Sequence, residues 1–143
     1  MGPKRGVALT HLVDTSVLTR LRHSTVRTAL EPLTAGGQVA RAGISDLEVG
    51  FSARNLREWT QLAVALAAFP LIETDAAHLR RARQVQRLLA SRGLRGRKIP
   101  DLLVAAAAEE SGLAVLHYDA DFELVADITG QSHEWIVERG TAD

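Results

Sequence analysis

The chain of 143 residues is predicted to fold as a single α/β domain, in which a short, mostly parallel sheet of four to five strands is covered by helices on both faces. Three observations support this prediction. Segments rich in β-branched and large apolar residues alternate with segments of helical periodicity. Hydrophobic residues make up 46% of the chain and charged residues 24%, as in ordinary soluble domains. No repeat, low-complexity tract or linker divides the sequence.

The first part of the chain is expected to start with a strand. Residues 7–13 (VALTHLV) are rich in β-branched and large apolar residues and are followed by Asp-Thr-Ser. Apolar residues then recur at helical spacing in residues 16–21 and 25–33, up to Gly36. Residues 38–44 (QVARAGI) form a weaker candidate for the second strand.

The middle of the chain is expected to be helical and then to return to the sheet. Helical character runs from Ser45 to about Ala68, with a break near Arg54 and Asn55. Residues 70–74 (PLIET) are the candidate for a short third strand.

Two helices are expected next. Thr74 is predicted to cap a long helix over residues 76–91, whose apolar positions follow helical spacing and which stops at Gly93. A second helix is predicted over residues 101–111, ended by Gly112.

Residues 113–118 (LAVLHY) are the expected fourth strand, and residues 133–139 (HEWIVER) are a candidate fifth. Strands separated by helices favour parallel pairing through right-handed crossovers. In open sheets of this kind, ligands bind beyond the carboxyl ends of the strands, where the strand order reverses. Residues that follow the strands are therefore the first candidates for a site.

The composition excludes several classes of protein. There is no Cys, so disulfides, thiolate catalysis and cysteine metal sites are excluded, and any metal must bind oxygen or imidazole. Residues 1–6 are expected to be a flexible tail, and the apolar run after them contains His11 and ends on Asp14 without a cleavage site, so no signal peptide is expected. The most hydrophobic stretch, residues 62–69 (LAVALAAF), is too short to span a bilayer. A soluble, cytoplasmic protein is therefore expected.

The zero net charge conceals an uneven distribution. Residues 1–100 carry sixteen Lys and Arg against seven Asp and Glu, whereas residues 101–143 carry one against ten. Residues 76–100 contain no acid and eight bases, which are Arg80, Arg81, Arg83, Arg87, Arg92, Arg95, Arg97 and Lys98. Such a run forms either a solvated helix face or a surface that binds phosphate groups.

Five acids occupy positions at which a parallel sheet gathers ligand-binding residues. Asp14 follows the first strand, and Glu48 lies near the start of the helix after the second. Asp101 opens the helix that leads to the fourth strand, and Asp119 and Asp121 follow that strand in the segment HYDADF. These acids are the candidate site residues.

Each acid also has a structural explanation. Asp14 could cap the next helix, and Ser45 with Glu48 fits a capping box. Asp101 is an acid at a helix start, which the helix dipole favours, and the pair in HYDADF could belong to a turn. Together, however, several carboxylates would converge at one edge of the sheet, where they repel one another unless a cation neutralises them.

A metal site is the natural hypothesis. Carboxylate ligands without Cys favour a hard cation, Mg²⁺ or Mn²⁺. The histidines have no spacing that suggests a metal site and are expected to be ordinary core or surface residues; they are His11, His23, His78, His117 and His133. Both tryptophans, Trp59 and Trp135, are expected to pack in the core rather than to stack on bases.

Three segments in this order resemble the PIN domain, and within it the VapC toxins of bacterial toxin–antitoxin pairs. They are LVDTSVL near the amino terminus, SDLEVGFSAR in the first third and IPDLLVAAAAEESGLAVLHYDADFELVA near the end. A short terminal strand follows, so the resemblance extends from about Val7 to Val137. It implies a three-layer α/β/α PIN-like domain and a ribonuclease dependent on Mg²⁺ or Mn²⁺.

The resemblance also implies roles for individual residues. An acidic quartet of the family matches Asp14, Glu48, Asp101 and Asp119. Asp14, Asp101 and Asp119 are the expected metal ligands, while Asp121 matches a further acid of the last motif. Ser16 matches a small hydroxyl residue that could bond a metal-bound water or a phosphate.

The expected reaction is hydrolysis of a phosphodiester by metal-activated water, which leaves a 5′-phosphate and a 3′-hydroxyl. The acidic site would repel RNA, so positive charge beside it is needed. That charge is expected from the residues leading into Asp101, namely Arg92, Arg95, Arg97 and Lys98.

The resemblance further implies two protein partners. One is a VapB-like antitoxin whose carboxyl-terminal segment wraps the toxin and inserts an Arg or Lys into the acidic pocket. The other is a second copy of the chain, bound through residues 16–30 or through the helix around residues 62–69. A catalytically inactive PIN-like module that binds RNA or protein is the alternative hypothesis.

Overall fold

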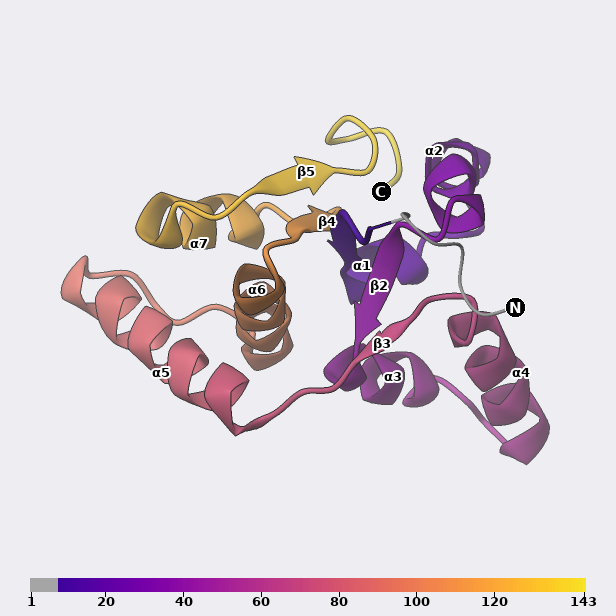
Figure 1. Cartoon of the computed structure of the whole chain (residues 1–143), viewed down its shortest axis with the longest axis horizontal. Helices are drawn as coiled ribbons and strands as arrows, with labels where there is room; N and C mark the ends of the chain where they lie inside the picture. Colours follow the sequence, from indigo (N-terminus) through magenta and orange to yellow (C-terminus); the bar gives the residue numbers. More distant parts are fainter. Residues whose placement is uncertain (1–7) are drawn as a thin grey trace.

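Five parallel strands form the centre of the protein, in the order β3-β2-β1-β4-β5 (Figure 1). The computed structural model describes residues 8–143, so the tail predicted at residues 1–6 lies outside the described part. The strands are β1 (His11–Val13), β2 (Val39–Ala42), β3 (Leu71–Ile72), β4 (Ala114–His117) and β5 (His133–Trp135). The predicted parallel sheet, including its fifth strand, is confirmed.

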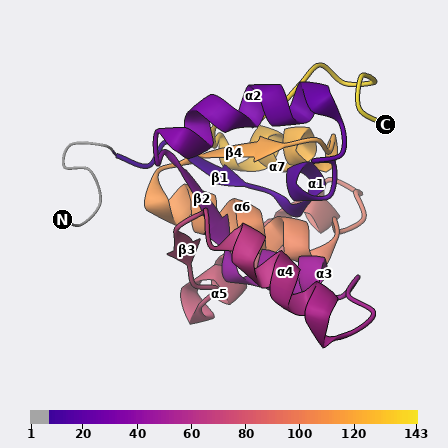
Figure 2. The same ribbon diagram turned by 90° about the vertical axis from the view of Figure 1, so that its right-hand side faces the viewer.

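Seven helices surround this sheet in the described part of the chain. They are α1 (Thr15–Leu18), α2 (Ser24–Ala35), α3 (Gly43–Gly50), α4 (Leu56–Leu66), α5 (Ala76–Ser91), α6 (Ile99–Ser111) and α7 (Asp121–Thr129). Figure 2 shows α2 on one side of the central strands and α6 on the other. The predicted three-layer α/β/α arrangement is confirmed.

Alternate residues of each central strand face opposite layers, as the geometry of a strand requires. Leu12 and Val115 belong to the core beneath α5, α6 and α7. Their neighbours Val13 and Leu116 belong to the core beneath α1 and α2. Both faces of β1 and β4 are therefore buried, as the apolar character of these strands predicted.

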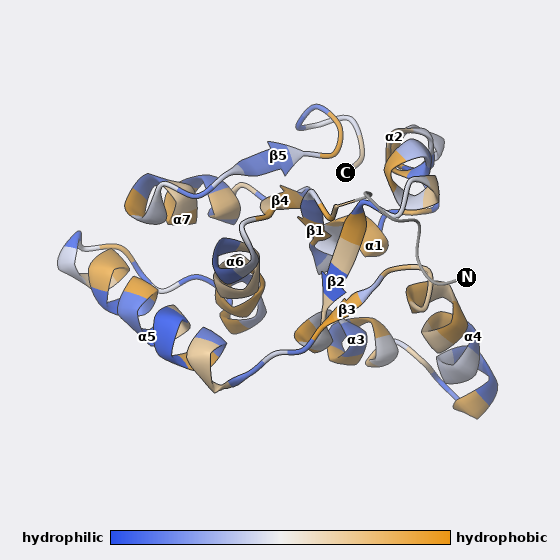
Figure 3. Ribbon diagram, in the orientation of Figure 1, coloured by the Kyte–Doolittle hydropathy of each residue, from blue (hydrophilic) through white to orange (hydrophobic). Residues whose placement is uncertain are grey.

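Helix α6 is the most deeply buried helix of the described chain. All eight residues from Asp101 to Ala108 are buried, and Figure 3 shows how hydrophobic this helix is beside α5, which carries long hydrophilic stretches. Gly112 ends α6 in the left-handed conformation, as predicted. None of the helices within residues 8–143 combines the length and the apolar character needed to cross a bilayer.

Some predicted boundaries were wrong. The second strand stops at Ala42 because α3 already begins at Gly43. The cap of α5 is Asp75 rather than Thr74, whose hydroxyl oxygen instead accepts a hydrogen bond from the Ile44 N–H at 3.1 Å. Helix α7 was not predicted at all.

The sheet topology determines where a ligand can bind. Strand β1 lies between β2 and β4, and the chain fills one side of β1 before it crosses to the other. The strand order therefore reverses between β1 and β4, and the crevice lies beyond their carboxyl ends. Asp14 follows β1 directly, and Asp119 lies two residues after β4.

Candidate active site

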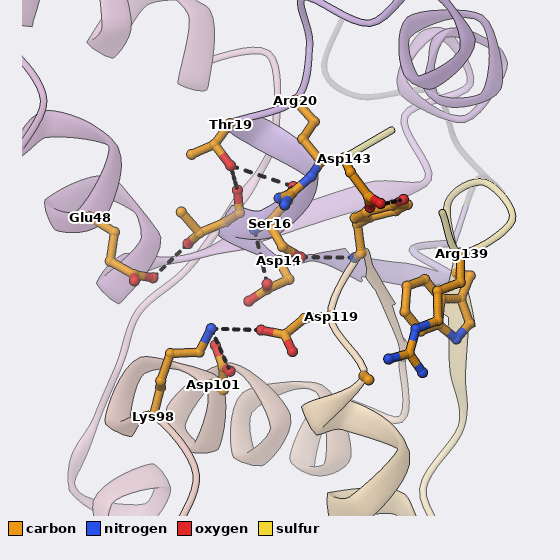
Figure 4. Close-up of a pocket in the computed structure, with 14 residues that line it drawn as sticks. Asp14, Ser16, Thr19, Arg20, Glu48, Lys98, Asp101, Asp119, Arg139 and Asp143 are labelled. Carbon is orange, nitrogen blue, oxygen red and sulfur yellow. Dashed lines mark hydrogen bonds and ion pairs between the residues drawn. The ribbon is translucent and has the colours of Figure 1, made fainter. Parts of the chain in front are cut away.

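A cavity of about 530 Å³ opens at this crevice, and four of the five predicted acids line it. Asp14 and Glu48 reach it from one side, and Asp101 and Asp119 from the other (Figure 4). These residues come from four separate parts of the chain, which the parallel sheet brings to one edge. The expected convergence of carboxylates is therefore present.

Three carboxylates form the tightest group. One oxygen each from Asp101, Asp119 and Asp121 lies within 4.8 Å of the other two. Asp14 lies outside this group but close enough for its charge to raise the pKa of Asp101. Asp121, at the start of α7, thus belongs to this group although it does not line the cavity.

Two oxygens of this site are buried without a hydrogen-bond partner in the described chain. They are Oδ1 of Asp14 and Oδ2 of Asp101, and their residues are only 2% and 5% exposed. An unpaired buried oxygen is costly, and a bound ion, ligand or water is one way in which a native protein compensates it. Oxygen donors of this kind fit a hard divalent cation.

Burial, with a smaller effect of neighbouring charges, changes how the acids of the site titrate. Burial raises the pKa of Asp14 from 3.8 to about 6, against the opposing hydrogen bonds from Ser16. Burial, together with the charges of Asp14 and Asp119, raises the pKa of Asp101 from 3.8 to about 8. The protein therefore holds two carboxylates that resist ionisation until a positive charge is near.

Lys98 supplies one such charge. Its Nζ lies 2.8 Å from Oδ2 of Asp119 and 3.7 Å from Oδ2 of Asp101 (Figure 4). Although burial opposes it, the hydrogen bond from Lys98 lowers the pKa of Asp119, and the same bond raises the pKa of Lys98. The ammonium thus neutralises part of the acidic group from its open side.

The other predicted basic residues are placed differently. Arg97 contacts Asp121, with Nη1 3.4 Å from Oδ1. Arg92 and Arg95 are exposed, and neither has a carboxylate within 4.0 Å in residues 8–143. Their charges are available to a ligand outside the protein.

Glu48 does not belong to a capping box, so that structural explanation was wrong. Helix α3 starts three residues earlier than the box requires, and its capping residue is Ala42, which makes no side-chain cap bond. Glu48 instead accepts a hydrogen bond from the Thr15 hydroxyl, with 2.6 Å between the oxygens, and Oγ of Ser45 lies 2.9 Å from that hydroxyl. Thr15, which was not predicted, therefore orients Glu48 at the cavity.

Asp14 caps a helix and also leaves one oxygen unbonded at the cavity. Its Oδ2 caps α1 by accepting a hydrogen bond from the Ser16 N–H at 2.9 Å, while its Oδ1 is left unpaired. Oγ of Ser16 accepts the Tyr118 N–H at 2.9 Å, which joins the ends of β1 and β4. Ser16 lines the cavity, and its backbone and side chain both bond to Asp14 and lower the pKa of that acid.

His117 is a further residue that supports the site. Its Nδ1 accepts the N–H of Asp119 at 3.1 Å, so the other ring nitrogen, Nε2, is the one that donates to His133 at 2.9 Å. Burial lowers the pKa of His117 to about 4, so the ring stays neutral and keeps this arrangement near neutral pH. The prediction of an ordinary core histidine therefore omitted its bond to the backbone of Asp119.

The sequence did not reveal the far wall of the cavity. Arg20, Tyr118, Trp135, Arg139 and Asp143 line it beside the acids. Trp135 ends β5 and therefore lies at the same carboxyl edge of the sheet as the acids. The fifth strand predicted from the sequence ran to residue 139, so Trp135 was not expected at this edge.

Known proteins similar to the chain agree on one family. The family model described as PIN domain matches residues 11–128. Ribonuclease VapC51 of Mycobacterium tuberculosis is 63% identical over 137 residues, covering 96% of this chain and 100% of that protein. Ribonuclease VapC21 of the same species is 43% identical over 134 residues, covering 92% of this chain and 97% of that protein.

Solved structures show the same fold. DNA-bound VapBC from Salmonella typhimurium contains a chain that matches with a TM-score of 0.76 at 18% identity, covering 90% of this chain and 99% of that one. VapBC-5 from Mycobacterium tuberculosis, a member of the VapBC family of toxin–antitoxin systems, contains a chain that matches with a TM-score of 0.60 at 25% identity. That match covers 90% of this chain and 96% of the other.

Proposed function

The chain belongs to the PIN domain family and to the VapC ribonucleases within it, and from this we propose that it is a metal-dependent endoribonuclease toxin held inactive by a cognate antitoxin. The observation that carries the proposal is the pair of buried oxygens, Oδ1 of Asp14 and Oδ2 of Asp101, that accept no hydrogen bond from the described residues although their residues line a solvent-open cavity. Structural capping alone would leave no such oxygens.

Asp14, Asp101 and Asp119 would hold Mg²⁺, or Mn²⁺ in its place, with Asp121 close enough to share the ion. An ion bound there lowers the pKa of water and stabilises the charge that develops on a phosphodiester. The raised pKa values of Asp14 and Asp101 support this proposal, because both carboxylates gain from a neighbouring cation.

The protein's own groups would orient the reactants. Glu48 is held at Oε1 by Thr15, which leaves Oε2 to accept a hydrogen bond from the attacking water. The Ser16 hydroxyl would donate to a phosphate oxygen, since its own oxygen already accepts from Tyr118. Attack by water requires no covalent nucleophile, and the expected products carry a 5′-phosphate and a 3′-hydroxyl.

RNA binding would depend on the basic segment that precedes α6. Arg92 and Arg95 are exposed and have no carboxylate partner in the described chain, so they can pair with phosphates. Arg97 and Lys98 stand between them and the acids, and they reduce the repulsion that an RNA backbone meets there.

The antitoxin would act on the same acids. The contact of Lys98 with Asp101 and Asp119 shows that this site accepts a cationic side chain. An Arg or Lys inserted by the antitoxin would therefore bind favourably in the absence of a metal. The similarity to VapBC-5, which is a toxin–antitoxin system, supports such a partner.

A second copy of the chain would bind through α3 and α4, which lie side by side in Figures 1 and 2. Four large apolar residues of this region are exposed, namely Leu47, Phe51, Leu56 and Trp59. In contrast, Val26 and Leu30 of α2 are buried in the core. Of the two stretches expected to dimerise, the helix around residues 62–69 is therefore the better supported.

The deciding experiment is cleavage of total cellular RNA by the purified protein, with Mg²⁺ or Mn²⁺ and with a chelator. Asp101→Asn keeps the size of the side chain and removes one ligand charge. Asp127→Asn makes the same change at an exposed residue of α7 outside the cavity and serves as the matched control. We expect metal-dependent fragments with 5′-phosphates from the wild type and the control.

Loss of cleavage in a folded Asp101→Asn variant would support the acidic site. Equal activity in that variant, or activity that persists in the chelator, would contradict the proposed mechanism. Inactivity of the wild type on varied RNAs would favour an inactive binding module instead.

A further inference from the structure

The cavity has a second wall that differs chemically from the acidic one. It is formed by Trp135 and Arg139, from the end of β5 and the carboxyl-terminal segment, together with Tyr118, which follows β4 and is itself buried. Because this wall and the acids line the same cavity, a molecule held by the acids would extend across it (Figure 4).

Trp135 is fixed in place without being buried. Its Nε1–H points to Oε2 of Glu123 at 3.4 Å. Its ring centroid lies 5.0 Å from that of His117 and 5.4 Å from that of Tyr118, both in edge-to-face contact. The indole therefore packs against the core beneath α1 and α2, as predicted in part, but remains only partly covered.

The carboxyl-terminal segment is also firmly attached to this wall. The Tyr118 hydroxyl donates to Oδ1 of Asp143 at 2.7 Å and accepts the N–H groups of Gly140 at 2.8 Å and Ala142 at 3.0 Å. Arg20 donates from Nε to the Ala142 carbonyl at 3.1 Å, and its guanidinium lies 4.7 Å from the centre of the Tyr118 ring. The wall is thus preorganised.

Arg139 adds an available positive charge. Its side chain is 70% exposed, and its guanidinium lies 5.8 Å from the centre of the Trp135 ring. The one carboxylate within 4.0 Å of it in the described residues belongs to Glu123, at the limit of that distance. The charge is therefore free to pair with a phosphate.

A partly exposed indole with a guanidinium beside it matches the chemistry of a nucleotide. Aromatic side chains stack on any base because every base has a π face, and arginine adds cation–π and phosphate contacts. We propose that Trp135 and Arg139 form a nucleotide subsite, which stacks one base of the RNA next to the phosphodiester held at the acids. This inference rests on the proposed ribonuclease function and deepens it.

Binding can be tested without catalysis, by tryptophan fluorescence. The chain has two tryptophans, so in Trp59→Phe the only tryptophan emission comes from Trp135. In the matched variant Trp135→Phe it comes only from Trp59, which lies on α4 outside the cavity. We expect a single-stranded RNA of about twelve nucleotides, added in a chelator at low salt, to quench Trp135 saturably and to leave Trp59 unchanged.

Kinetics then separate positioning from folding. With RNA and Mg²⁺ or Mn²⁺, Trp135→Leu should raise KM by about tenfold and Arg139→Gln by about threefold, with kcat changed less than about twofold. Trp135→Phe should restore most of the affinity, because a phenyl ring also stacks. Arg139→Gln changes an exposed side chain, so its effect cannot be attributed to loss of the fold.

Absence of quenching at Trp135, equal quenching at both tryptophans, or an unchanged KM in both variants would overturn the subsite. These results are distinct from failure of the ribonuclease itself. A wild type that cleaves no RNA but shows quenching at Trp135 would refute the nuclease and retain the subsite. A wild type that cleaves RNA in a metal-dependent way but shows no quenching at Trp135 would support the nuclease and refute the subsite.

Discussion

Two clusters of acids lie at opposite ends of α6, and they differ in whether their atoms have partners. Near its start, oxygens of Asp101, Asp119 and Asp121 lie within 4.8 Å of one another. Near its end, ligand atoms of Asp75, His78 and Glu110 meet the same criterion. Distance alone would rank the two as equal candidates for a metal.

The second cluster is explained by its role at the start of α5, which it caps. His78 accepts the Asp75 N–H at Nδ1 and donates from Nε2 to Glu110 at 3.1 Å, while Asp75 accepts the His78 N–H at 3.1 Å. Together these bonds form the capping box of α5 and tie it to α6. Every buried atom of this cluster is satisfied, so no ion is required.

The first cluster has the opposite character. Oδ2 of Asp101 is buried and accepts no hydrogen bond in the described part of the chain, although Nζ of Lys98 lies 3.7 Å away, and burial with nearby negative charge raises the pKa of this residue. Its members come from the start of α6 and from the end of β4, which only the tertiary fold brings together. A group of acids therefore indicates a site when its atoms remain unpaired, not merely when they are close.

The largest expected effect separates the two clusters by activity. Asp119→Asn removes a carboxylate charge at the cavity and should lower kcat/KM for RNA at least about 100-fold, or about 2.7 kcal/mol of transition-state stabilisation. Glu110→Gln removes a charge from the other cluster and should change kcat/KM less than about twofold. Initial rates on one RNA measure both. A large loss in Glu110→Gln would show that the second cluster also serves catalysis.

The next effect is on stability, and here the second cluster, rather than the first, should show the larger loss. His78→Ala removes a buried side chain and half of a capping box, so it should lower the free energy of unfolding by roughly 2–3 kcal/mol. The activity of the remaining folded protein should be unchanged. Urea unfolding measures the loss, and Glu110→Gln, which keeps an acceptor for His78, is the control. A variant that unfolds like the wild type would contradict the structural role.

A third effect depends on pH. The pKa of Asp14 is raised to about 6 and that of Asp101 to about 8, both from 3.8. A raised pKa in the folded state favours the neutral acid, so this contribution is complete below about pH 4 and is lost as pH rises through these values. In a chelator, stability should therefore fall by about 1–3 kcal/mol from about pH 5 to about pH 9.

Mg²⁺ or Mn²⁺ should reverse this loss, because the ion binds the ionised carboxylates. The rise in Tm on adding the ion should increase with pH and should be much smaller in Asp101→Asn, which lacks one titrating group. Thermal unfolding of both proteins over this pH range measures the effect. A metal-induced rise in Tm that is the same at every pH would argue against ligation by these two acids.

The sequence predicted most of the features that depend on local chemistry. The parallel sheet followed from alternating strand and helix patterns, and the positions of Asp14 and Asp119 followed from the ends of β1 and β4. Helix α7 was missed even though Phe122 and Val125 have helical spacing, because the segment is short and its two acids also fit a turn. These errors arise where two local explanations compete.

Features that depend on tertiary contacts could not be predicted. The hydrogen bond from Thr15 to Glu48 joins residues on α1 and α3, and no sequence spacing relates them. The Trp135 wall exists because β5 pairs with β4, which places that residue beside Tyr118. The sequence indicated which acids gather at the edge of the sheet but not which of their atoms are left without a hydrogen bond.

The smallest expected effect tests whether the basic segment makes the acidic edge accessible to RNA. Arg92 and Arg95 are exposed and have no carboxylate partner in residues 8–143. If each contacts one phosphate, Arg92→Gln and Arg95→Gln should each raise KM about two- to fivefold and leave kcat unchanged. Each should also lower the slope of log affinity against log salt by about one.

The matched control is Arg54→Gln, because Arg54 is also exposed but is already paired with Glu58 at 2.8 Å. It should change neither KM nor the salt slope, because its charge is already paired with a carboxylate. Loss of this surface ion pair should also cost little stability. The salt dependence of RNA binding, measured by anisotropy of a labelled RNA, tests whether Arg92 and Arg95 contact phosphates. Equal slopes for all three variants would mean that RNA approaches the acids by another route, with Arg97 and Lys98 supplying the positive charge alone.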